Sequence, residues 1–343
     1  MIVILGTYTH DVFGQDSTGS PGILRCRLED ATGALTLLDS TPCRNPSFVA
    51  LSPDGTLLAA AEEMKQGGAL HLFSVGEEGA LTPLARQPLE GMECCFLEFS
   101  PAGNFLTAAH YGSGEAFAWA VSPAGFGERT FSHFDQGTGP VADRQERAHV
   151  HSVRLIPSLS AAVVCDLGND TVSFYRYGED GSMVPHEIPT LQVPAGVGPR
   201  HSEFTPDGSR LYLTGELSNE VLFYALEAGA YVLRQRVSTL PEGFEGFNTA
   251  ADVHFDGKGH LIASNRGHDS LVTYDLAPDG TLRAPRWVST GRTPRQFAVA
   301  GKWLLCACQD SGEAQVFSLG ENGPAGPVST LAAPGAVCVA IAR

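Results

Sequence analysis

The sequence lacks any hydrophobic run long enough to cross a bilayer. Basic residues are also scarce, since 22 lysines and arginines stand against 38 aspartates and glutamates, for a net charge of −16 at pH 7. Nucleic acids and anionic membranes recruit proteins through basic surfaces, so we expect neither as a partner. The short apolar N-terminus has no basic region before it and no cleavage site, and we therefore predict a cytoplasmic protein.

Several signatures of enzyme chemistry are missing as well. There is no Gly-x-Ser-x-Gly nucleophile motif, no His-Glu-x-x-His motif, no Gly-x-x-x-x-Gly-Lys phosphate loop and no dinucleotide fingerprint. The eight cysteines include no Cys-x-x-Cys pair and lie mostly within or beside apolar runs. We predict that they are buried free thiols and that the protein uses no cofactor and no metal.

The sequence does contain a hydrophobic motif that recurs six times. Each copy has an apolar run, a tight turn, a second apolar run and a polar loop. The copies begin at Phe48, Phe96, Val153, Glu203, Val253 and Phe297. Their spacings of roughly 44 to 57 residues are typical of the blades of a propeller.

The turn residues indicate that each copy is a β-hairpin. In Ser52-Pro-Asp-Gly55 the proline presets one turn position and the glycine accepts a positive φ at another. The runs that follow, such as residues 56–61, are nearly all apolar, as in strands buried on both faces. A third, alternating strand follows in most copies, and the polar stretch after it has room for a fourth. Four antiparallel strands make a blade.

The two ends of the chain fit each other. Residues 336–341 have the pattern of an inner strand with no partner after it, while residues 1–5 and 23–28 have the pattern of blade strands with no inner strand before them. Together they make a seventh blade and remove the exposed sheet edges. We predict an all-β protein, a seven-bladed β-propeller of four-stranded antiparallel blades, formed by residues 1–343 as one domain and closed by its terminal strands.

This topology brings the start of each inner strand and the end of each second strand to one mouth of the central channel. The first of these positions forms a column of Ser47, Cys95, His151, Arg200, Ala251 and Arg295, and the second a column of Glu63, Tyr111, Glu216, Arg266 and Gln309. A residue that the scaffold requires should recur from copy to copy, as proline does at Pro46, Pro199 and Pro294. The charged residues do not recur, and inward arginines are costly unless paired or ligand-bound. Either they bind a ligand or Glu216 and Glu63 simply form ion pairs with them.

Several phrases resemble the seven-bladed propeller lactonase family, which includes the propeller type of 6-phosphogluconolactonase and the fungal carboxy-cis,cis-muconate cyclase. They are Arg144-Gln-Glu-Arg-Ala-His-Val-His-Ser-Val153, Gly198-Pro-Arg-His201, Gly215-Glu-Leu-Ser-Asn219, Ser264-Asn-Arg-Gly-His-Asp-Ser270 and Thr293-Pro-Arg-Gln-Phe297. The resemblance covers essentially the whole chain. It implies a catalytic cluster of His151, Glu216, Arg200 and Arg266, all of which also belong to the two columns. We add Arg295, His149, Glu63 and Gln309 as expected substrate-binding residues.

The resemblance implies a lactonase whose partner is a small anionic sugar lactone, with 6-phosphogluconolactone as the expected substrate. A histidine or carboxylate would activate water, and arginines would clamp the anion and stabilise the developing oxyanion. A lactonising isomerase of the muconate cyclase kind, or a propeller that only binds a ligand or protein, are the alternatives. Protein-binding propellers often carry a Trp-Asp dipeptide, which this sequence lacks, so we favour an enzyme. The sequence leaves open whether His151 or Glu216 is the base, and it does not indicate an oligomeric state.

Overall fold

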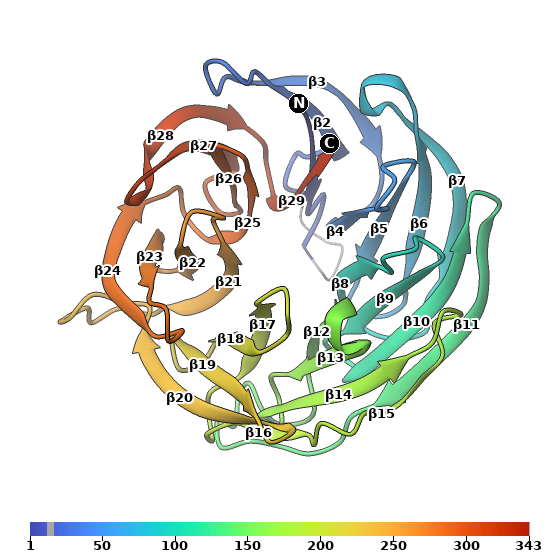
Figure 1. Cartoon of the computed structure of the whole chain (residues 1–343). Coiled ribbons are helices and arrows are strands. Elements are labelled where there is room, and N and C mark those ends of the chain that lie inside the picture. Colours follow the sequence, from blue (N-terminus) through green and yellow to red (C-terminus); the bar gives the residue numbers. More distant parts are fainter. Residues whose placement is uncertain (12–16, 343) are drawn as a thin grey trace.

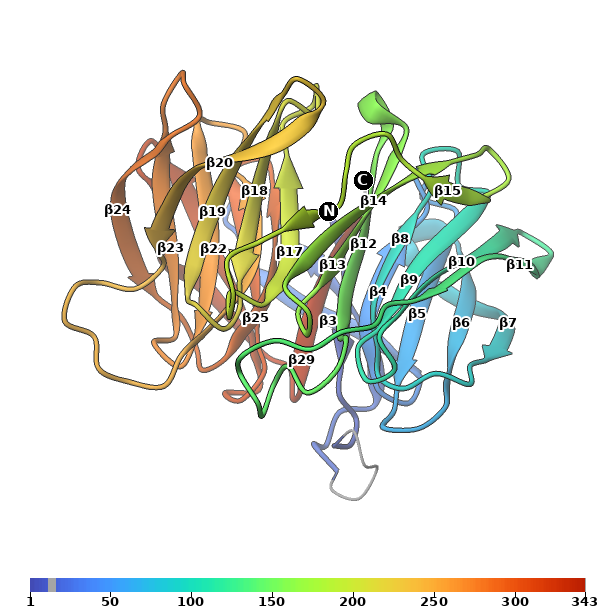
Figure 2. The same cartoon turned by 90° about the horizontal axis from the view of Figure 1, so that it is seen from below.

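Seven antiparallel β-sheets stand around a central axis in the computed structural model, which describes residues 1–11 and 17–342 (Figure 1). Seen from the side, the strands run between the two faces of a disc (Figure 2). Helix within these ranges is limited to two short 3-10 turns, η1 (Glu77–Gly79) and η2 (Pro157–Leu159). Neither the turns nor any other described segment is a helix long and apolar enough to cross a membrane.

We number the blades along the chain and give each from its innermost strand outward. Blade 1 contains β29 (Ala336–Ala342), β1 (Ile2–Thr7), β2 (Gly22–Leu28) and β3 (Leu35–Pro42). Blade 2 contains β4 (Pro46–Leu51), β5 (Leu57–Glu63), β6 (Gly68–Val75) and β7 (Leu81–Pro88). Blade 3 contains β8 (Cys94–Phe99), β9 (Phe105–His110), β10 (Glu115–Ser122) and β11 (Gly125–Phe134). Blade 4 contains β12 (Val150–Ile156), β13 (Ala161–Asp166), β14 (Thr171–Tyr177), β15 (Met183–Pro185) and β16 (Leu191–Gln192).

The other three blades repeat the plan. Blade 5 contains β17 (Pro199–Phe204), β18 (Arg210–Gly215), β19 (Glu220–Glu227) and β20 (Ala230–Ser238). Blade 6 contains β21 (Thr249–Phe255), β22 (His260–Arg266), β23 (Ser270–Leu276) and β24 (Leu282–Ser289). Blade 7 contains β25 (Pro294–Ala300), β26 (Trp303–Cys308), β27 (Glu313–Gly320) and β28 (Gly323–Ala332). The predicted seven-bladed propeller is confirmed.

The ring closes in blade 1, where the two ends of the chain pair with each other. Strand β29 lies antiparallel to β1, with Ile2 opposite Ala342 and Leu5 opposite Val339, and the termini lie near each other in Figure 1. The C-terminal strand is thus the innermost strand of a blade whose other strands come from the N-terminus, as predicted. Closure pairs both strands that would otherwise end the ring as open edges.

The hairpin turns have the geometry that their residues predict. Gly55 sits at φ 72° and Gly208 also at φ 72°, in the left-handed region that glycine adopts without steric cost. In the first of these turns the Gly55 N–H donates to the carbonyl of Ser52 (2.9 Å), and the Ser52 hydroxyl accepts from the N–H of Leu57. The turn therefore satisfies its own backbone groups and needs no support from other blades.

The second strand of each blade lies between two sheets and is buried on both faces. All seven residues of β5 and all six of β9 are buried, which confirms the prediction from their apolar runs. Apolar clusters fill the wedges between neighbouring blades; one joins Leu5 and Leu24 of blade 1 to Leu305 and Val316 of blade 7. All eight cysteines are buried and free, again as predicted.

Blade 4 departs from the predicted four strands. Its outer edge is split into β15 and β16, and both short strands pair with β14. The stretch that forms them contains Pro185, Pro189 and Pro194. Proline has no N–H to give to a ladder, so an edge with three prolines pairs only in short pieces.

Candidate active site

An extra residue near the start of each of six inner strands turns the first column of side chains toward the channel. Register with the second strand shifts between Pro46 and Phe48, Cys94 and Phe96, Val150 and Ser152, Pro199 and Ser202, Ala250 and Val253, and Pro294 and Gln296. The residues left out of the ladder include Ser47, Cys95, His151, Arg200, Ala251 and Arg295, which is the whole first column. A β-bulge re-aims a side chain without breaking the sheet, so this repeated bulge redirects one first-column side chain in each of these blades.

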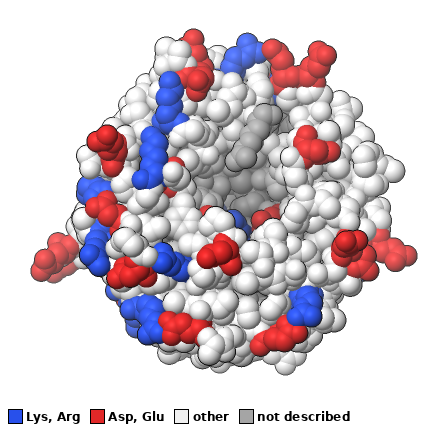
Figure 3. Space-filling model, viewed as in Figure 1, with Lys and Arg blue, Asp and Glu red and all other residues white. Residues whose placement is uncertain are grey.

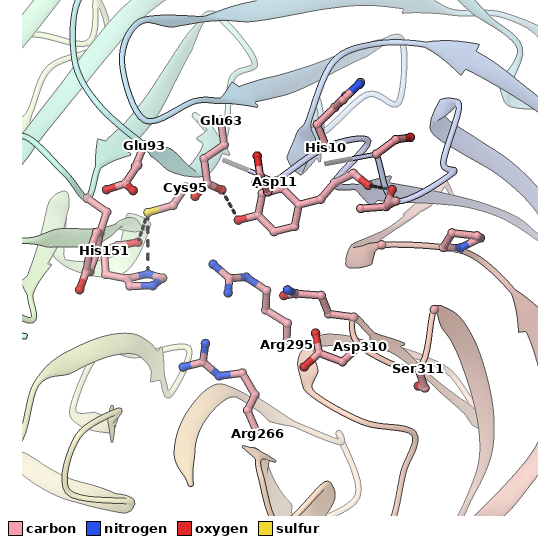
Figure 4. A pocket seen from close by; sticks show the side chains of 18 of the residues that line it. His10, Asp11, Glu63, Glu93, Cys95, His151, Arg266, Arg295, Asp310 and Ser311 are labelled. Carbon is pink, nitrogen blue, oxygen red and sulfur yellow. Dashed lines mark hydrogen bonds between the residues drawn. The ribbon is translucent and has the colours of Figure 1, made fainter. Parts of the chain in front are cut away.

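A cavity of about 770 Å³ opens at this mouth of the channel. From the first column it is lined by Cys95, His151 and Arg295, and from the second by Glu63, Tyr111, Glu216, Arg266 and Gln309. Figure 4 shows the guanidinium groups of Arg266 and Arg295 pointing into the cavity on the side of His151. The volume lies within the range of small-molecule sites. The structure therefore places the second column and three members of the first around one space, whereas Ser47, Arg200 and Ala251 do not line it.

Three arginines surround the carboxylate of Glu216, and we call Arg144, Arg200 and Arg266 the arginine cluster. Oε1 of Glu216 accepts from Nη2 of Arg144 at 2.5 Å, while Oε2 lies 2.9 Å from Nε of Arg200 and 2.7 Å from Nη2 of Arg266. Glu216 is only 3 % exposed. Burial raises the pKa of this carboxyl, but the charges of Arg266 and Arg200 outweigh burial and hold the pKa well below its usual range. Glu216 is therefore an anion. Arg200 contacts it but does not itself line the cavity.

His151 lies beside this anion, with Nε2 4.0 Å from Oε2 of Glu216. Its other ring nitrogen faces the thiol of Cys95, 3.9 Å from Sγ. Burial, and then the positive charge of Arg200, lower the pKa of His151 well below the usual value of 6.5. The imidazole is consequently neutral at pH 7, the form that can accept a proton.

Arg295 faces the cavity from blade 7. Within residues 1–11 and 17–342 its guanidinium has no hydrogen bond or ion pair, and its nearest aromatic contact is the ring of Tyr8, 5.7 Å away. The Tyr8 hydroxyl instead donates to Oε2 of Glu63 at 2.7 Å. Burial raises the pKa of Tyr8 well above 10, so the phenol keeps its proton. Among the described residues Arg295 is thus a cation whose donors have no partner, and it lines the same cavity as the neutral His151.

Of the expected site residues, Arg200 does not line this cavity but contacts Glu216 from behind it, and His149 lies outside it as well. Its ring stacks on Tyr111 with centroids 4.3 Å apart, and its Nε2 lies 3.0 Å from a carboxylate oxygen of Glu146. Tyr111 lines the cavity and His149 lies behind it, in a neighbouring hollow. No group of three or more His, Cys, Asp or Glu side chains in the described part of the chain is arranged to hold a metal ion.

The columns missed two residues that line the cavity. Arg144 lies outside the repeats, whereas Tyr8 directly follows β1 and takes the second-column position of blade 1, a blade that has no continuous copy in the sequence. Arg144 comes from the connection between β11 and β12, where the sequence copies are furthest apart. Gln145 fixes this connection by donating to the carbonyl of Leu167 at 2.8 Å and accepting from the N–H of Val141. The long spacing was the available signal that an extra segment reaches the site.

Asp166 anchors the end of the same connection and makes the stability of the fold depend on pH. Its Oδ1 accepts from the N–H groups of His149 (2.7 Å) and Gly168 (2.8 Å). Burial, reinforced by the negative charge of Asp135, raises the pKa of Asp166 from 3.8 to about 7. The folded state thus keeps a proton that the unfolded state releases near pH 4. The stability that this proton contributes is complete below pH 4 and is lost as the pH rises to about 7.

We therefore expect the melting temperature of the Asp166→Asn variant to fall less between pH 5 and pH 8 than that of the unaltered protein. Asparagine keeps the oxygen acceptor and carries no titrating proton. Thermal denaturation at several pH values measures the slope of melting temperature against pH for both proteins. Parallel slopes would show that Asp166 does not titrate in this range.

Fold and cavity together define a class: a seven-bladed propeller with a buried histidine, a carboxylate and several arginines at one mouth of its channel. Residues 2–341 match the family model described as "Lactonase, 7-bladed beta-propeller". The chain belongs to this family.

Curated relatives and solved structures agree with this assignment along nearly the whole chain. A 6-phosphogluconolactonase of Bacillus subtilis is 30% identical over 347 residues, covering 98% of this chain and 96% of that protein. A Lactococcus lactis relative, 32% identical over 92% of this chain and 91% of its own, is described only as an uncharacterized protein. The structure of a periplasmic gluconolactonase from Pseudomonas aeruginosa has a TM-score of 0.90 at 27% identity and covers 100% of this chain and 99% of its own.

Proposed function

We propose that this protein hydrolyses an anionic sugar lactone and that its substrate is 6-phosphogluconolactone. The observation that carries the proposal is that two groups face one cavity: the guanidinium of Arg295, which has no hydrogen bond or ion pair with the described residues, and the neutral imidazole of His151. A phosphorylated lactone needs a cation for its phosphate and a base beside its carbonyl. Relatives named 6-phosphogluconolactonase support the choice of substrate.

In this proposal His151 is the general base, and Glu216 is not. The Glu216 carboxylate is surrounded by three guanidinium groups that stabilise its charge, so it is a poor proton acceptor. His151 is neutral and lies at the cavity surface. Glu216, 4.0 Å from Nε2, would stabilise the imidazolium that forms when His151 takes a proton.

The chemical steps follow from these positions. His151 removes a proton from water while the water oxygen adds to the lactone carbonyl carbon. Arg266, whose guanidinium points into the cavity, donates to the carbonyl oxygen as it becomes negative. The bond between the carbonyl carbon and the ring oxygen then breaks, and the imidazolium returns the proton to that oxygen. The product is the open-chain acid, and the histidine is neutral again.

The direct test is hydrolysis of freshly generated 6-phosphoglucono-δ-lactone, corrected for its spontaneous rate. We expect the folded protein to accelerate the reaction and to prefer this substrate over unphosphorylated glucono-δ-lactone. Equal turnover of both lactones would support a lactonase but contradict the proposed recognition of the substrate phosphate. If neither lactone were hydrolysed but a carboxylated muconate were isomerised, the cyclase reaction would be the function instead.

Arg295 should bind the phosphate in the ground state as well as in the transition state. We expect the Arg295→Met variant, which keeps an unbranched apolar stem, to raise KM for the phosphorylated lactone by about 10- to 100-fold, since a charge-assisted hydrogen bond contributes about 1.5 to 3 kcal/mol. Its kcat should change little, and its KM for glucono-δ-lactone should not change. Steady-state kinetics with both lactones measure this. An equal loss on both substrates would place the phosphate elsewhere.

We also propose a cytoplasmic location for this protein. One structural relative is described as periplasmic. Fractionation of cells that express the untagged chain tests this, and recovery in a periplasmic extract would contradict it.

A further inference from the structure

A second network of buried polar side chains contacts Arg200, on the side of the arginine cluster away from the substrate cavity. It is formed by His201, Asp252 and His254. Arg200 and His201 are neighbours in β17, and strict strand alternation would send their side chains to opposite faces. Both lie in the bulge between Pro199 and Ser202, where the ladder is interrupted. As a result, Nη1 of Arg200 is only 3.4 Å from Nε2 of His201.

His201 is fixed from its far side by Asp252, which lies in the equivalent bulge of β21. The His201 Nδ1 to Asp252 Oδ1 distance is 2.7 Å, and the two residues are 6 % and 1 % exposed. The other oxygen of Asp252 lies 3.0 Å from Nε2 of His254 and accepts from the N–H of Phe297 at 3.2 Å. Asp252 is therefore held at both oxygens and cannot turn away from His201.

These contacts determine which nitrogen of His201 carries the proton. Burial opposes ionisation of Asp252, but the charge of His254 and the hydrogen bonds from both histidines hold the pKa of Asp252 well below its usual range. A carboxylate only accepts, so Nδ1 of His201 must be the donor. Burial, and then the charge of Arg200, lower the pKa of His201 to about 4, so the ring is neutral. Nε2 then presents its lone pair to Arg200.

As a result, the Arg200 guanidinium has polar contacts on two of its edges. Nη1 donates to the carbonyl of Ala251 at 2.8 Å and faces His201, while Nε lies 2.9 Å from Glu216. Resting on the proposed lactonase function, we infer that Asp252 and His201 are positioning residues: Asp252 sets the tautomer of His201, whose free nitrogen holds Arg200 against Glu216 and beside His151.

Packing alone does not account for this arrangement. The ring of His201 is surrounded by the aromatic rings of Phe96, Phe48 and His151, with centroids 5.6, 6.5 and 5.3 Å away. An apolar side chain would fill such a space, and apolar replacement of buried charged networks is often neutral or stabilising. The polar groups instead form one directed chain from Asp252 through His201 to Arg200. Figure 3 shows a hollow at the centre of the disc. A smaller pocket lined by His201, Asp252 and His254 shares no lining residue with the substrate cavity.

The first test reads the tautomer of His201 in the unaltered protein. Nitrogen-15 NMR at neutral pH, assigned with a His201→Phe variant, should show a protonated Nδ1 and an unprotonated Nε2. A proton on Nε2 would overturn the inference, because Nε2 would then oppose the donors of Arg200. This experiment needs no turnover, so it remains decisive if the protein proves not to be a lactonase.

The second test uses Asp252→Asn, with Asp256→Asn as its matched control. Asp256 also accepts from a buried histidine, since its Oδ2 is 2.6 Å from Nδ1 of His260, but this pair lies at the β21–β22 turn and lines no part of the cavity. We expect Asp252→Asn to lower kcat on the order of 10- to 100-fold, the usual effect of removing an outer hydrogen-bond partner. KM should change little, and the control should retain its kcat.

The pH profile distinguishes positioning from simple loss of stability. The charge of Arg200 lowers the pKa of His151. If Asp252→Asn lets Arg200 move away, the acid limb of kcat/KM should shift to higher pH, whereas Asp256→Asn should leave it in place. An unshifted limb with an unchanged kcat in Asp252→Asn would overturn the inference. If that variant does not fold, the tautomer measurement decides.

Discussion

The His151→Asn variant is expected to lose about 10²- to 10⁴-fold in kcat for 6-phosphoglucono-δ-lactone, the usual contribution of a positioned general base. Asparagine keeps a polar group of similar reach but cannot take a proton from water. The imidazole is neutral in the resting site, so its removal should not alter the charge that binds the substrate, and KM should stay nearly constant. Stopped-flow measurement of acid release from fresh lactone, above the spontaneous rate, provides both constants.

A matched control is available in blade 2. His71 bonds to Glu62 at 2.8 Å between Nε2 and Oε2, as a histidine beside a carboxylate, yet it lies outside the cavity. His71→Asn should therefore retain full kcat. If His151→Asn also kept most of its activity, Glu216 would have to be the base despite its three arginines, and the assignment of roles would be reversed.

The fold could be predicted because its determinants are local and repeated. Each hairpin carries its own turn chemistry, as at Gly55 and Gly208, and each second strand carries its own apolar run. Seven similar units then leave little choice of arrangement. The split edge of blade 4 escaped prediction because three prolines act on one outer strand that no other copy resembles.

The site was predictable only where it follows the repeat. The bulge that turns Cys95, His151 and Arg295 toward the cavity recurs in equivalent strands, so counting along the copies finds these positions. Arg144 reaches the cavity from the connection between β11 and β12, which no periodicity points to. Tyr8 does stand at the second-column position of blade 1, but the chain ends divide that blade, so no continuous sequence copy leads to it.

His201 illustrates a different limit. Strict alternation along β17 would place its side chain on the opposite face of the strand from that of Arg200. The bulge adds one residue to the strand, and His201 instead joins Arg200 and Asp252. A pattern with period two cannot reveal a residue that interrupts the period.

Glu216→Gln should have the largest effect on stability of any change in the cavity. The carboxylate faces three guanidinium groups, and glutamine fills the same volume without the charge. Removing one partner of a buried ion pair costs about 3 to 5 kcal/mol, because the opposite charge is left uncompensated. We expect the free energy of unfolding to fall by about this amount, as measured by urea denaturation, together with loss of lactone turnover.

Inorganic phosphate should restore much of the stability of Glu216→Gln, since an anion that binds only the folded state raises its stability in proportion to the logarithm of its concentration. Without its carboxylate the arginine cluster becomes an anion site beside Arg295. Glu115→Gln is the control, because Glu115 is a buried carboxylate bonded to His110 and Arg129 in blade 3, outside the cavity. Both variants should be destabilised, but only Glu216→Gln should gain more from phosphate than the unaltered protein does. An equal gain in all three would mean that the arginines serve the scaffold alone, whereas a selective gain is what a site built to receive an anionic substrate requires.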